Sequence, residues 1–275
     1  MKRLFGTLLS VSLVLIGLSA YSIDQNNILV HWSFDELDGE IFKDESGNGH
    51  DGRLDGDGAV VEGRINNAVH LTGGYVTLAS GIGNVVESVG ATGEISMEAS
   101  IYLSAHDAWD SVISIGEGDE NGPLEGNRAI IFRMMVSPDL TPYWNIGYRA
   151  DHNFPDFVFD LDTWYHYVIT GDSQTSKIYV NGELIVDDPH ANHNVPEDFA
   201  FATYTDVFMF VGAGEAPHVW RFEDAIVDEV AIYNKVLSEG EINDLMANGI
   251  PGVLTSVDAQ DKLAARWGEI KAQHE

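Results

Sequence analysis

The chain has 275 residues, of which 44% are hydrophobic, so it can form one large domain or two small domains with a substantial core. It contains no cysteine, which excludes disulfides, thiol catalysis and zinc sites built on thiolates. Its formal net charge of −30 disfavours nucleic acids and anionic membrane surfaces as partners, and its many carboxylates suit hard cations such as Ca²⁺.

The first residues have the pattern of a secretory signal peptide. Lys2-Arg3 forms a positively charged start, and the run from Leu4 to Leu18 is mostly apolar. Ala20 and Ser22 are small residues two positions apart, so we expect cleavage after Ser22, or alternatively after Ala20. A membrane anchor needs about 20 apolar residues, more than this run offers. We therefore predict a signal peptide over 1–22, secretion to the extracellular space or the periplasm, and no membrane span after cleavage.

Alternating apolar and polar residues predict β-strands through most of the chain. From Glu94 to Leu103 the apolar side chains take every second position, which predicts a strand with one buried face and a polar face carrying Glu98. The segment 177–186 predicts a hairpin, because Asn181-Gly182 suits the two positive-φ positions of a type I′ turn. Further strands are expected at 28–34, 67–71, 74–78, 111–115, 129–135, 143–149, 164–170, 207–211 and 219–233. Such short strands, separated by turn signals, favour an all-β protein with two antiparallel sheets in a sandwich or jelly roll.

One short helix is expected after the last strand. Ser238 fits the N-cap, Glu241 stands at the capping-box position, and apolar residues follow at helical spacing until Asn248-Gly249. We interpret 23–250 as one domain and 251–275 as a C-terminal helical tail, which could dock on the sandwich, hold a partner or remain loose.

Two acidic segments far apart in the chain draw attention to a metal. Asp228 is in phase with Val230 and Ile232, so we expect its carboxylate to point into the core with these residues. A buried carboxylate needs a partner, which could be a cation, a salt bridge or backbone N–H groups. Asp35 ends the first predicted strand, and the loop 44–52 is rich in oxygen donors and glycine, as in calcium loops or in a plain Asx turn.

An ordered set of segments resembles one family. These segments are Trp32-Ser33-Phe34-Asp35, Asp44-Glu45-Ser46-Gly47-Asn48-Gly49-His50-Asp51-Gly52, Ser96-Met97-Glu98-Ala99-Ser100-Ile101-Tyr102, Trp164-Tyr165-His166-Tyr167, Lys177-Ile178-Tyr179-Val180-Asn181-Gly182 and Val227-Asp228-Glu229-Val230-Ala231-Ile232-Tyr233. Together they resemble the LamG-like jelly-roll family of concanavalin A-like sandwiches. The likeness runs from about residue 28 to 247.

The resemblance implies two packed antiparallel sheets and a role in binding glycans or protein partners. Relatives often carry a structural calcium that joins the first and last strands, held by an early acidic residue, a backbone oxygen of the following loop and a late Asp. The matching positions are Asp35, the stretch with Asn48 and His50, and Asp228, so these four residues are the predicted Ca²⁺ ligands. This prediction requires that the first and last strands lie side by side.

Some members of this superfamily are glycoside hydrolases, whose retaining forms carry the pattern E-x-D-x-x-E on one strand face. Glu117-Gly118-Asp119 begins such a pattern, but Gly122 stands where the second Glu belongs. Glu98 is a single strand carboxylate without a partner two residues on. We therefore predict no enzyme activity, with a polysaccharide-cleaving hydrolase or lyase as the alternative.

A binding surface is the remaining candidate site. Arginines suit carboxylate or sulfate groups, and aromatic rings can stack on sugars. The predicted ligand-binding residues lie within or just after the expected strands 129–135 and 143–149. They are Arg133, Trp144, Asn145, Tyr148, Arg149 and His152. In the alternative interpretation, the arginines pair with carboxylates and the aromatic side chains pack the core. The sequence thus predicts a secreted, non-enzymatic binding or adhesion module for carbohydrate or an extracellular protein.

Overall fold

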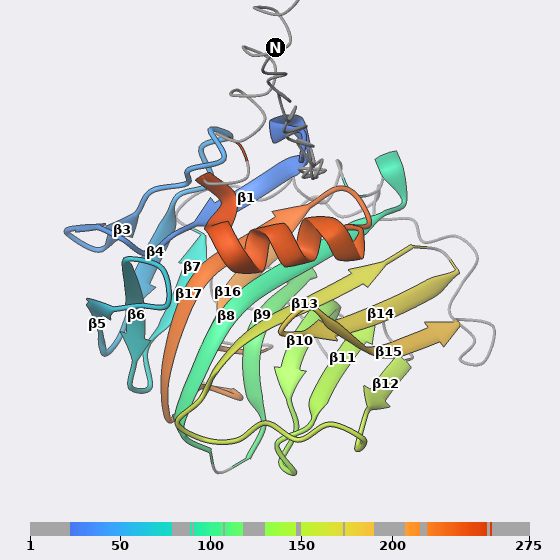
Figure 1. Ribbon diagram of the computed structural model, residues 1–275. Coiled ribbons are helices and arrows are strands. Elements are labelled where there is room, and N and C mark those ends of the chain that lie inside the picture. The colour runs from blue at the N-terminus through green and yellow to red at the C-terminus, as the bar shows by residue number, and fades with distance from the viewer. Residues whose placement is uncertain are drawn as a thin grey trace, which may run out of the picture.

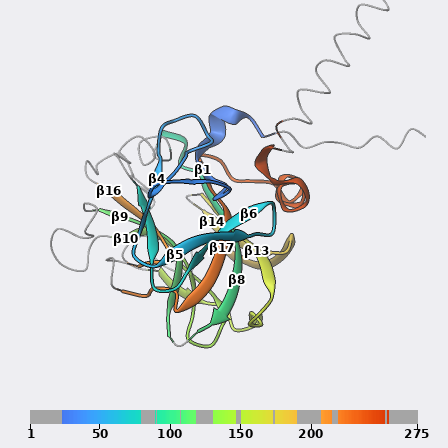
Figure 2. The ribbon, with the colours of Figure 1, turned by 90° about the vertical axis from the view of Figure 1, so that its left-hand side faces the viewer.

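The described strands form two antiparallel sheets packed face to face (Figures 1 and 2). The computed structural model describes residues 23–78, 89, 91–106, 108–117, 130–146, 150–172, 174–189, 207–214, 219–251 and 254. Sheet A contains, in spatial order, β15 (Glu183–Pro189), β14 (Thr175–Val180), β13 (Trp164–Gly171), β8 (Ile95–Ala105), β17 (Asp224–Tyr233), β6 (Asn67–Leu71) and β5 (Gly58–Glu62), with β1 (Ile28–Trp32) also paired to β17.

Sheet B contains, in spatial order, β12 (Ala150–Asn153), β11 (Pro142–Ile146), β10 (Ile130–Val136), β9 (Asp110–Glu117), β16 (Val207–Val211), β7 (Tyr75–Leu78), β4 (Gly52–Asp55), β3 (Ile41–Phe42) and β2 (Leu37–Asp38). The predicted two-sheet antiparallel sandwich is therefore confirmed. The sequence missed β2, β3, β4, β5 and β12, where a few residues carry little alternation, although it identified other strands as short as β7.

The main core fills the space between the two sheets. Trp32 of β1, Trp144 of β11 and Tyr167 of β13 are among its largest fully buried side chains. The indole Nε1 of Trp32 donates to the carbonyl of His50 at 2.8 Å, so burial leaves its polar atom satisfied. This core contains side chains from both sheets.

The first and last strands do lie side by side, as predicted. β1 pairs antiparallel with β17, with Trp32 opposite Val230. Asp228 of β17 lies opposite Ser100 of β8, whereas Ala231 lies opposite Glu98, so β17 has one extra residue there. This is a β-bulge, and Glu229 within it has a φ of 49°.

The bulge corrects the predicted orientation of Asp228. Val227 and Val230 both belong to the main core although they are three residues apart, because the extra residue reverses the alternation. Asp228 therefore does not share the inward face of Val230 and Ile232. It lies on the outer face of sheet A, beside Ser100.

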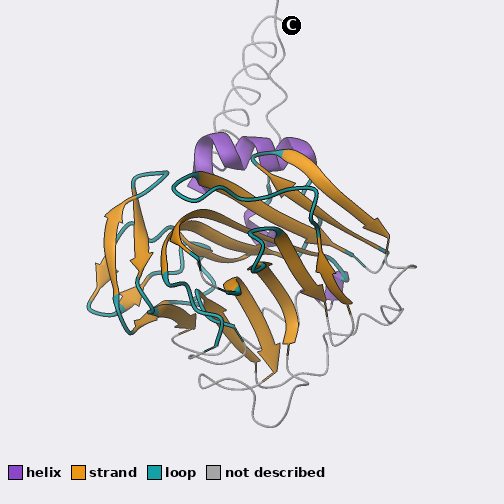
Figure 3. Cartoon of the chain, turned by 90° about the horizontal axis from the view of Figure 1, so that it is seen from below, coloured by secondary structure: helices purple, strands orange, loops and turns teal. Residues whose placement is uncertain are grey.

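A helix over residues 239–251 covers part of this outer face (Figures 1 and 3). The Ser238 amide donates to the Glu241 carboxylate at 2.8 Å, and the Glu241 amide donates to Ser238 Oγ at 3.3 Å, which confirms the predicted capping box. The helix and the sheet share a second core built from Ile28, Val168, Tyr179, Ala231, Tyr233, Leu237, Ile242, Leu245 and Ile250.

The helix explains why the polar face of β8 is not exposed. Ser96, Glu98 and Ser100 are buried, although their alternation with apolar residues predicted a face in solvent. Glu98 also has partners that the sequence did not suggest: Tyr233 Oη donates to it at 2.7 Å, and His166 Nε2 lies 3.3 Å away. Alternation identifies two different faces of a strand, but it does not reveal a second layer above the polar one.

The predicted Asn181-Gly182 turn is present at the other edge of the sheet. Asn181 and Gly182 have φ values of 51° and 77°, as a type I′ turn requires. The turn lies against the helix, because a Cβ on Gly182 would collide with the side chain of Asn243. The predicted signal peptide and nearly all of the predicted tail lie outside the described residues. Within the described residues, no helix has the length and apolar character needed to cross a membrane.

A buried ion pair joins the first and last strands beneath the helix. His31 Nε2 of β1 lies 2.9 Å from Glu229 Oε2 of β17, and both side chains are more than nine-tenths buried. Burial acts to lower the pKa of His31. The hydrogen bond to Glu229 and the charges of Glu229, Glu45 and Glu98 outweigh that effect, so the pKa of His31 lies above its usual value.

We expect the His31 pair to make stability depend on pH. Because the pKa of His31 is higher in the folded than in the unfolded chain, its stabilisation is complete below about pH 6.5 and is lost as pH rises through the folded pKa. Replacing His31 with Gln should lower the free energy of unfolding by about 3 kcal/mol near pH 6 and flatten this pH dependence. Urea unfolding of both proteins between pH 6 and 9 measures both effects.

His70→Gln is the matched control, because the His70–Asp224 pair is partly exposed on the same sheet. Its unfolding free energy should stay close to that of the unchanged protein. An equally steep pH dependence in His31→Gln would show that other groups cause it.

Candidate functional site

The outer face of sheet B carries aromatic and basic side chains. On β10, Phe132 and Met134 enter the main core, so Arg133 between them faces outward. On β7, Val76 enters the same core, and Tyr75 lies outward against Phe210 of β16, with ring centroids 5.5 Å apart. This face is opposite to the one that packs on sheet A (Figure 2).

Trp220 is held against Arg133 in a strained conformation. The guanidinium carbon of Arg133 lies 4.3 Å from the centroid of the Trp220 ring, a cation–π contact. Trp220 has a φ of 50°, which is unfavourable for a bulky residue. Its carbonyl accepts from the Ser111 amide at 3.0 Å, and a Cβ on Gly214 would come within 2.5 Å of its ring. The neighbouring backbone therefore fixes Trp220 in this position.

Arg221 makes a second arginine–aromatic contact next to the first. Its guanidinium carbon lies 5.7 Å from the centroid of the Tyr75 ring, and its Nη1 donates to the Gly73 carbonyl. Tyr75 and Arg221 are both partly exposed. We call the group Tyr75, Arg133, Trp220 and Arg221 the Trp220 surface.

The structure brings together only part of the predicted ligand-binding set. Arg133 lies opposite Asn145 in the pairing of β10 with β11, which places the two at neighbouring positions of the sheet. Trp144 was wrongly predicted to bind ligand, because it faces the main core and is 1% exposed. His152 lies opposite Trp144 rather than opposite Arg133 or Asn145. The predicted residues Tyr148 and Arg149 lie outside the described residues.

The sequence missed Tyr75, Trp220 and Arg221. A signal was present in the adjacent aromatic and basic residues Trp220-Arg221 and in the Gly73-Gly74 turn ahead of Tyr75. Their proximity to Arg133 depends on the order of strands in sheet B, in which β16 and β9 separate β7 from β10. That order cannot be derived from local patterns.

The predicted calcium ligands lie in two different places. Asp35 Oδ1 accepts from the Asn67 amide at 2.9 Å, and Asp228 Oδ2 accepts from the amides of Arg64 and Ile65 at 2.8 Å each. The two carboxylates thus hold the same turn, 63–67, between β5 and β6. Asn48 lies elsewhere, because its side-chain amide donates to the carbonyl of Ile28 at 2.9 Å, at the other end of β1.

His50 belongs to the same loop as Asn48. The loop is organised around Asp44, whose carboxylate accepts from the amides of His31, Ser46 and His50 at 2.9–3.0 Å. This is the Asx-turn alternative that the sequence left open. Among the described residues, no three His, Asp or Glu side chains gather closely enough to hold a metal ion.

Asp228 keeps one feature that fits a cation. It is fully buried, and its Oδ1 has no hydrogen-bond partner. Burial raises its pKa to about 7, although the amides of Ile65 and Arg64 act in the opposite direction. A positive charge near Oδ1 would favour the ionised form, so Asp228 has a free acceptor for a cation at the turn that Asp35 also contacts, whereas Asn48 and His50 lie elsewhere.

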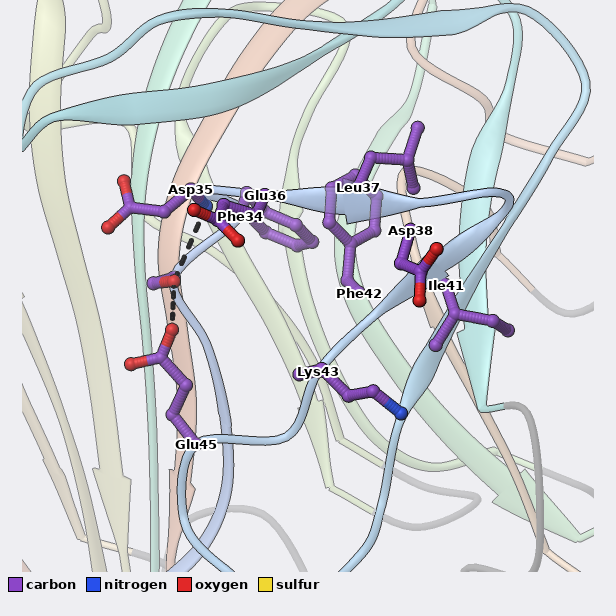
Figure 4. Close-up of a pocket in the computed structure, with 10 residues that line it drawn as sticks. Phe34, Asp35, Glu36, Leu37, Asp38, Ile41, Phe42, Lys43 and Glu45 are labelled. Atoms are coloured by element: carbon purple, nitrogen blue, oxygen red, sulfur yellow. Dashed lines mark hydrogen bonds between the residues drawn. The ribbon is translucent and has the colours of Figure 1, made fainter.

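A pocket of about 640 Å³ lies next to Asp35 (Figure 4). It is formed by the end of β1, the β2–β3 hairpin and the segment that follows, and its lining residues are Ser33, Phe34, Asp35, Glu36, Leu37, Asp38, Ile41, Phe42, Lys43 and Glu45. The rings of Phe34 and Phe42 meet edge to face, with centroids 4.9 Å apart. The acidic side chains make this pocket unsuitable for anions.

The model for the concanavalin A-like lectin/glucanases superfamily matches residues 71–243. A comparison with curated protein sequences found no match.

Three solved structures share the fold at low sequence identity. Domain 4 of AbnA, a GH43 extracellular arabinanase from Geobacillus stearothermophilus solved with arabinotriose, has a TM-score of 0.56 and 19% identity over 80% of this chain and 98% of that one. A sialidase from Trypanosoma rangeli has a TM-score of 0.58 and 16% identity over 80% of this chain and 32% of the sialidase. The binding domain of botulinum neurotoxin DC, solved with rat synaptotagmin II, has a TM-score of 0.55 and 14% identity over 81% of this chain and 52% of that domain.

These proteins include enzymes and binding domains, so the shared fold leaves both kinds of activity open. The family model, which matches residues 71–243, covers more than half of the chain and agrees with the two antiparallel sheets. This chain therefore belongs to the concanavalin A-like lectin/glucanases superfamily.

Proposed function

We propose that this chain is a secreted, non-enzymatic binding module that recognises carbohydrate at the Trp220 surface. The observation that carries the proposal is the strained, partly exposed Trp220 held against Arg133. A bulky residue at positive φ costs on the order of 1–3 kcal/mol, and such strain concentrates at ligand-binding positions. Aromatic rings also supply the flat apolar area on which sugar rings can stack, with polar groups beside them.

A non-enzymatic role is supported by the positions of the buried acids. Glycoside hydrolysis needs two carboxylates that flank the scissile bond of a bound substrate. Glu98, Asp228 and Glu229 are at most 5% exposed, on the outer face of sheet A where the 239–251 helix packs. A polysaccharide cannot reach them there.

The similar structures add circumstantial support for carbohydrate and for a second candidate. One of them is a domain solved with arabinotriose, and another is a binding domain solved with a protein, rat synaptotagmin II. A protein partner is therefore the second candidate function. It would use the same outer face, because the 239–251 helix occupies part of the other one.

Replacing Trp220 with Ala should strongly weaken glycan binding without unfolding the protein. Truncating a central aromatic anchor costs about 2 kcal/mol or more in binding, which is roughly a 30-fold loss of affinity. A glycan array identifies the ligand, and titration calorimetry of that ligand measures the loss.

Trp164→Ala is the matched control for this experiment. Trp164 is also partly exposed, but it lies in sheet A with its ring centroid 5.6 Å from that of Tyr102. The Trp164→Ala variant should bind the glycan with the same affinity as the unchanged protein. A silent array with a captured extracellular protein would favour the second candidate, and released reducing ends would favour a hydrolase.

We also propose that calcium binds beside Asp228 and Asp35 and ties β1 and β17 to the 63–67 turn. Chelation with EDTA should then lower the melting temperature of the unchanged protein by several degrees, because an occupied site stabilises the fold by mass action. Asp228→Asn keeps a side-chain oxygen for the two backbone amides but loses the charge, so EDTA should no longer shift its melting temperature. If EDTA changes the melting temperature of neither protein, calcium does not bind there and hydrogen bonds alone hold the 63–67 turn.

Secretion is tested directly by the N-terminus. Expressed with residues 1–22, the protein should leave the cytoplasm and begin at Ile23. N-terminal sequencing of the exported protein identifies the cleavage site. Retention of Met1 in the exported form would contradict a cleaved signal.

A further inference from the structure

Four described basic side chains in this acidic chain form ion pairs with carboxylates, and a fifth, Arg64, lies close to several acidic residues. The ion pairs are Lys43–Asp51 at 2.6 Å, Arg53–Asp55 at 2.9 Å, Lys177–Asp187 at 3.7 Å and Lys235–Glu241 at 2.5 Å. Arg64 lies within the field of Asp228, Glu98 and Glu229. With 44 acidic residues against 14 basic ones, such pairing is the expected fate of a cation.

Arg221 has no such carboxylate partner within the described part of the chain. Its Nη1 donates to the backbone carbonyl of Gly73, its Nε is buried without a hydrogen-bond partner, and it makes no ion pair. A guanidinium has five N–H donors, so most of its capacity stays unused in the folded protein. An arginine that is held in place but not neutralised is suited to a negative group that arrives from outside.

Arg221 is partly exposed and lies beside the Gly73 turn and the Tyr75 ring. Gly73, whose carbonyl accepts from Arg221, has a φ of 87°, and a Cβ there would meet no atom within 4 Å. The Tyr75 ring fixes one side of the guanidinium at 5.7 Å and is itself supported by Phe210 at 5.5 Å. The partly exposed guanidinium is therefore oriented by an aromatic ring, and the Gly73 turn that it contacts is not crowded by other side chains.

We infer that Arg221 receives an anionic substituent, a carboxylate or a sulfate, of the glycan that binds at the Trp220 surface. This inference rests on the proposed function and names its substrate class. Both substituents present oxygens in the arrangement that a guanidinium fork recognises. The sugar ring would stack on the exposed aromatic side chains while the substituent takes the free N–H donors of Arg221.

The overall charge of the chain does not prevent this contact. At about 0.15 M ionic strength the Debye length is about 8 Å, so most of the −30 charge is screened from an approaching ligand. A direct hydrogen-bonded contact at Arg221 is screened much less. The repulsion therefore slows association at low salt and leaves the contact itself in place.

The test compares a neutral galactan hexasaccharide with an oligogalacturonate and with a sulfated galactan oligosaccharide of similar length, by titration calorimetry at 0.15 M salt. The unchanged protein should bind at least one anionic ligand about tenfold more tightly than the neutral one. Arg221→Gln should lower affinity for the anionic ligand to that for the neutral ligand. Arg221→Lys should give an intermediate value, because it keeps the charge but loses the fork.

Arg53→Gln is the matched control, because it removes the same charge from an arginine already paired with Asp55. It should keep the anionic preference. The uronate and sulfate ligands show which anion the site takes. Equal binding of neutral and anionic sugars in the unchanged protein would overturn the substrate class and leave the proposed function standing. Silence of all three ligands together with a silent glycan array would remove both.

Circular dichroism would reveal whether Arg221→Gln fails to fold. In that case, the unchanged protein and Arg221→Lys still test whether the guanidinium contacts the anionic substituent. The anionic preference of the unchanged protein should shrink when salt is raised to about 1 M, where the Debye length is about 3 Å. A preference that does not change with salt or with Arg221→Lys would contradict the guanidinium contact.

Discussion

The pairing of β1 with β17 is the constraint on which the rest of the structure depends. It joins residues about two hundred positions apart and places Trp32 opposite Val230, within the main core. The bulge at Glu229 lets Val227 and Val230 both face that core while Asp228 and Glu229 stay out of it. Without the extra residue, strict alternation would bring a carboxylate or a gap into the apolar interior. The unfavourable φ of Glu229 is thus offset by core packing on both sides of it.

The buried ionic groups beneath the 239–251 helix have a different role from its apolar contacts. Each fully buried Ile or Leu contributes about 1.5–3 kcal/mol, so Ile242, Leu245 and Ile250 account for docking of the helix. Buried ion pairs roughly break even once desolvation is counted. The His31–Glu229 pair and the contact of Glu98 with Tyr233 therefore specify how β1, β8 and β17 are aligned, more than they add stability.

Local patterns in the sequence predicted what depends on local chemistry. The alternation along β8, the Asn181-Gly182 turn and the Ser238–Glu241 capping box are each determined by neighbouring residues. The sequence did not reveal the bulge at Glu229, because no neighbouring residue demands it, nor that the predicted helix packs above Glu98. For the candidate site, Arg133 was found, but its partner Trp220 comes from a distant segment whose position depends on sheet order. Trp144 was misassigned because one-residue alternation decides which face it takes.

The two outer faces of the sandwich differ in how far the fold itself stabilises their unusual residues. On sheet A, core packing and the His31–Glu229 ion pair stabilise the unfavourable φ of Glu229 within the fold. Beside sheet B, Trp220 keeps an unfavourable φ and Arg221 has no carboxylate partner, although each takes part in an arginine–aromatic contact. Departures from local preference that the fold does not compensate are expected where a ligand supplies the missing contacts. The outer face of sheet B is therefore the face that we propose for ligand binding.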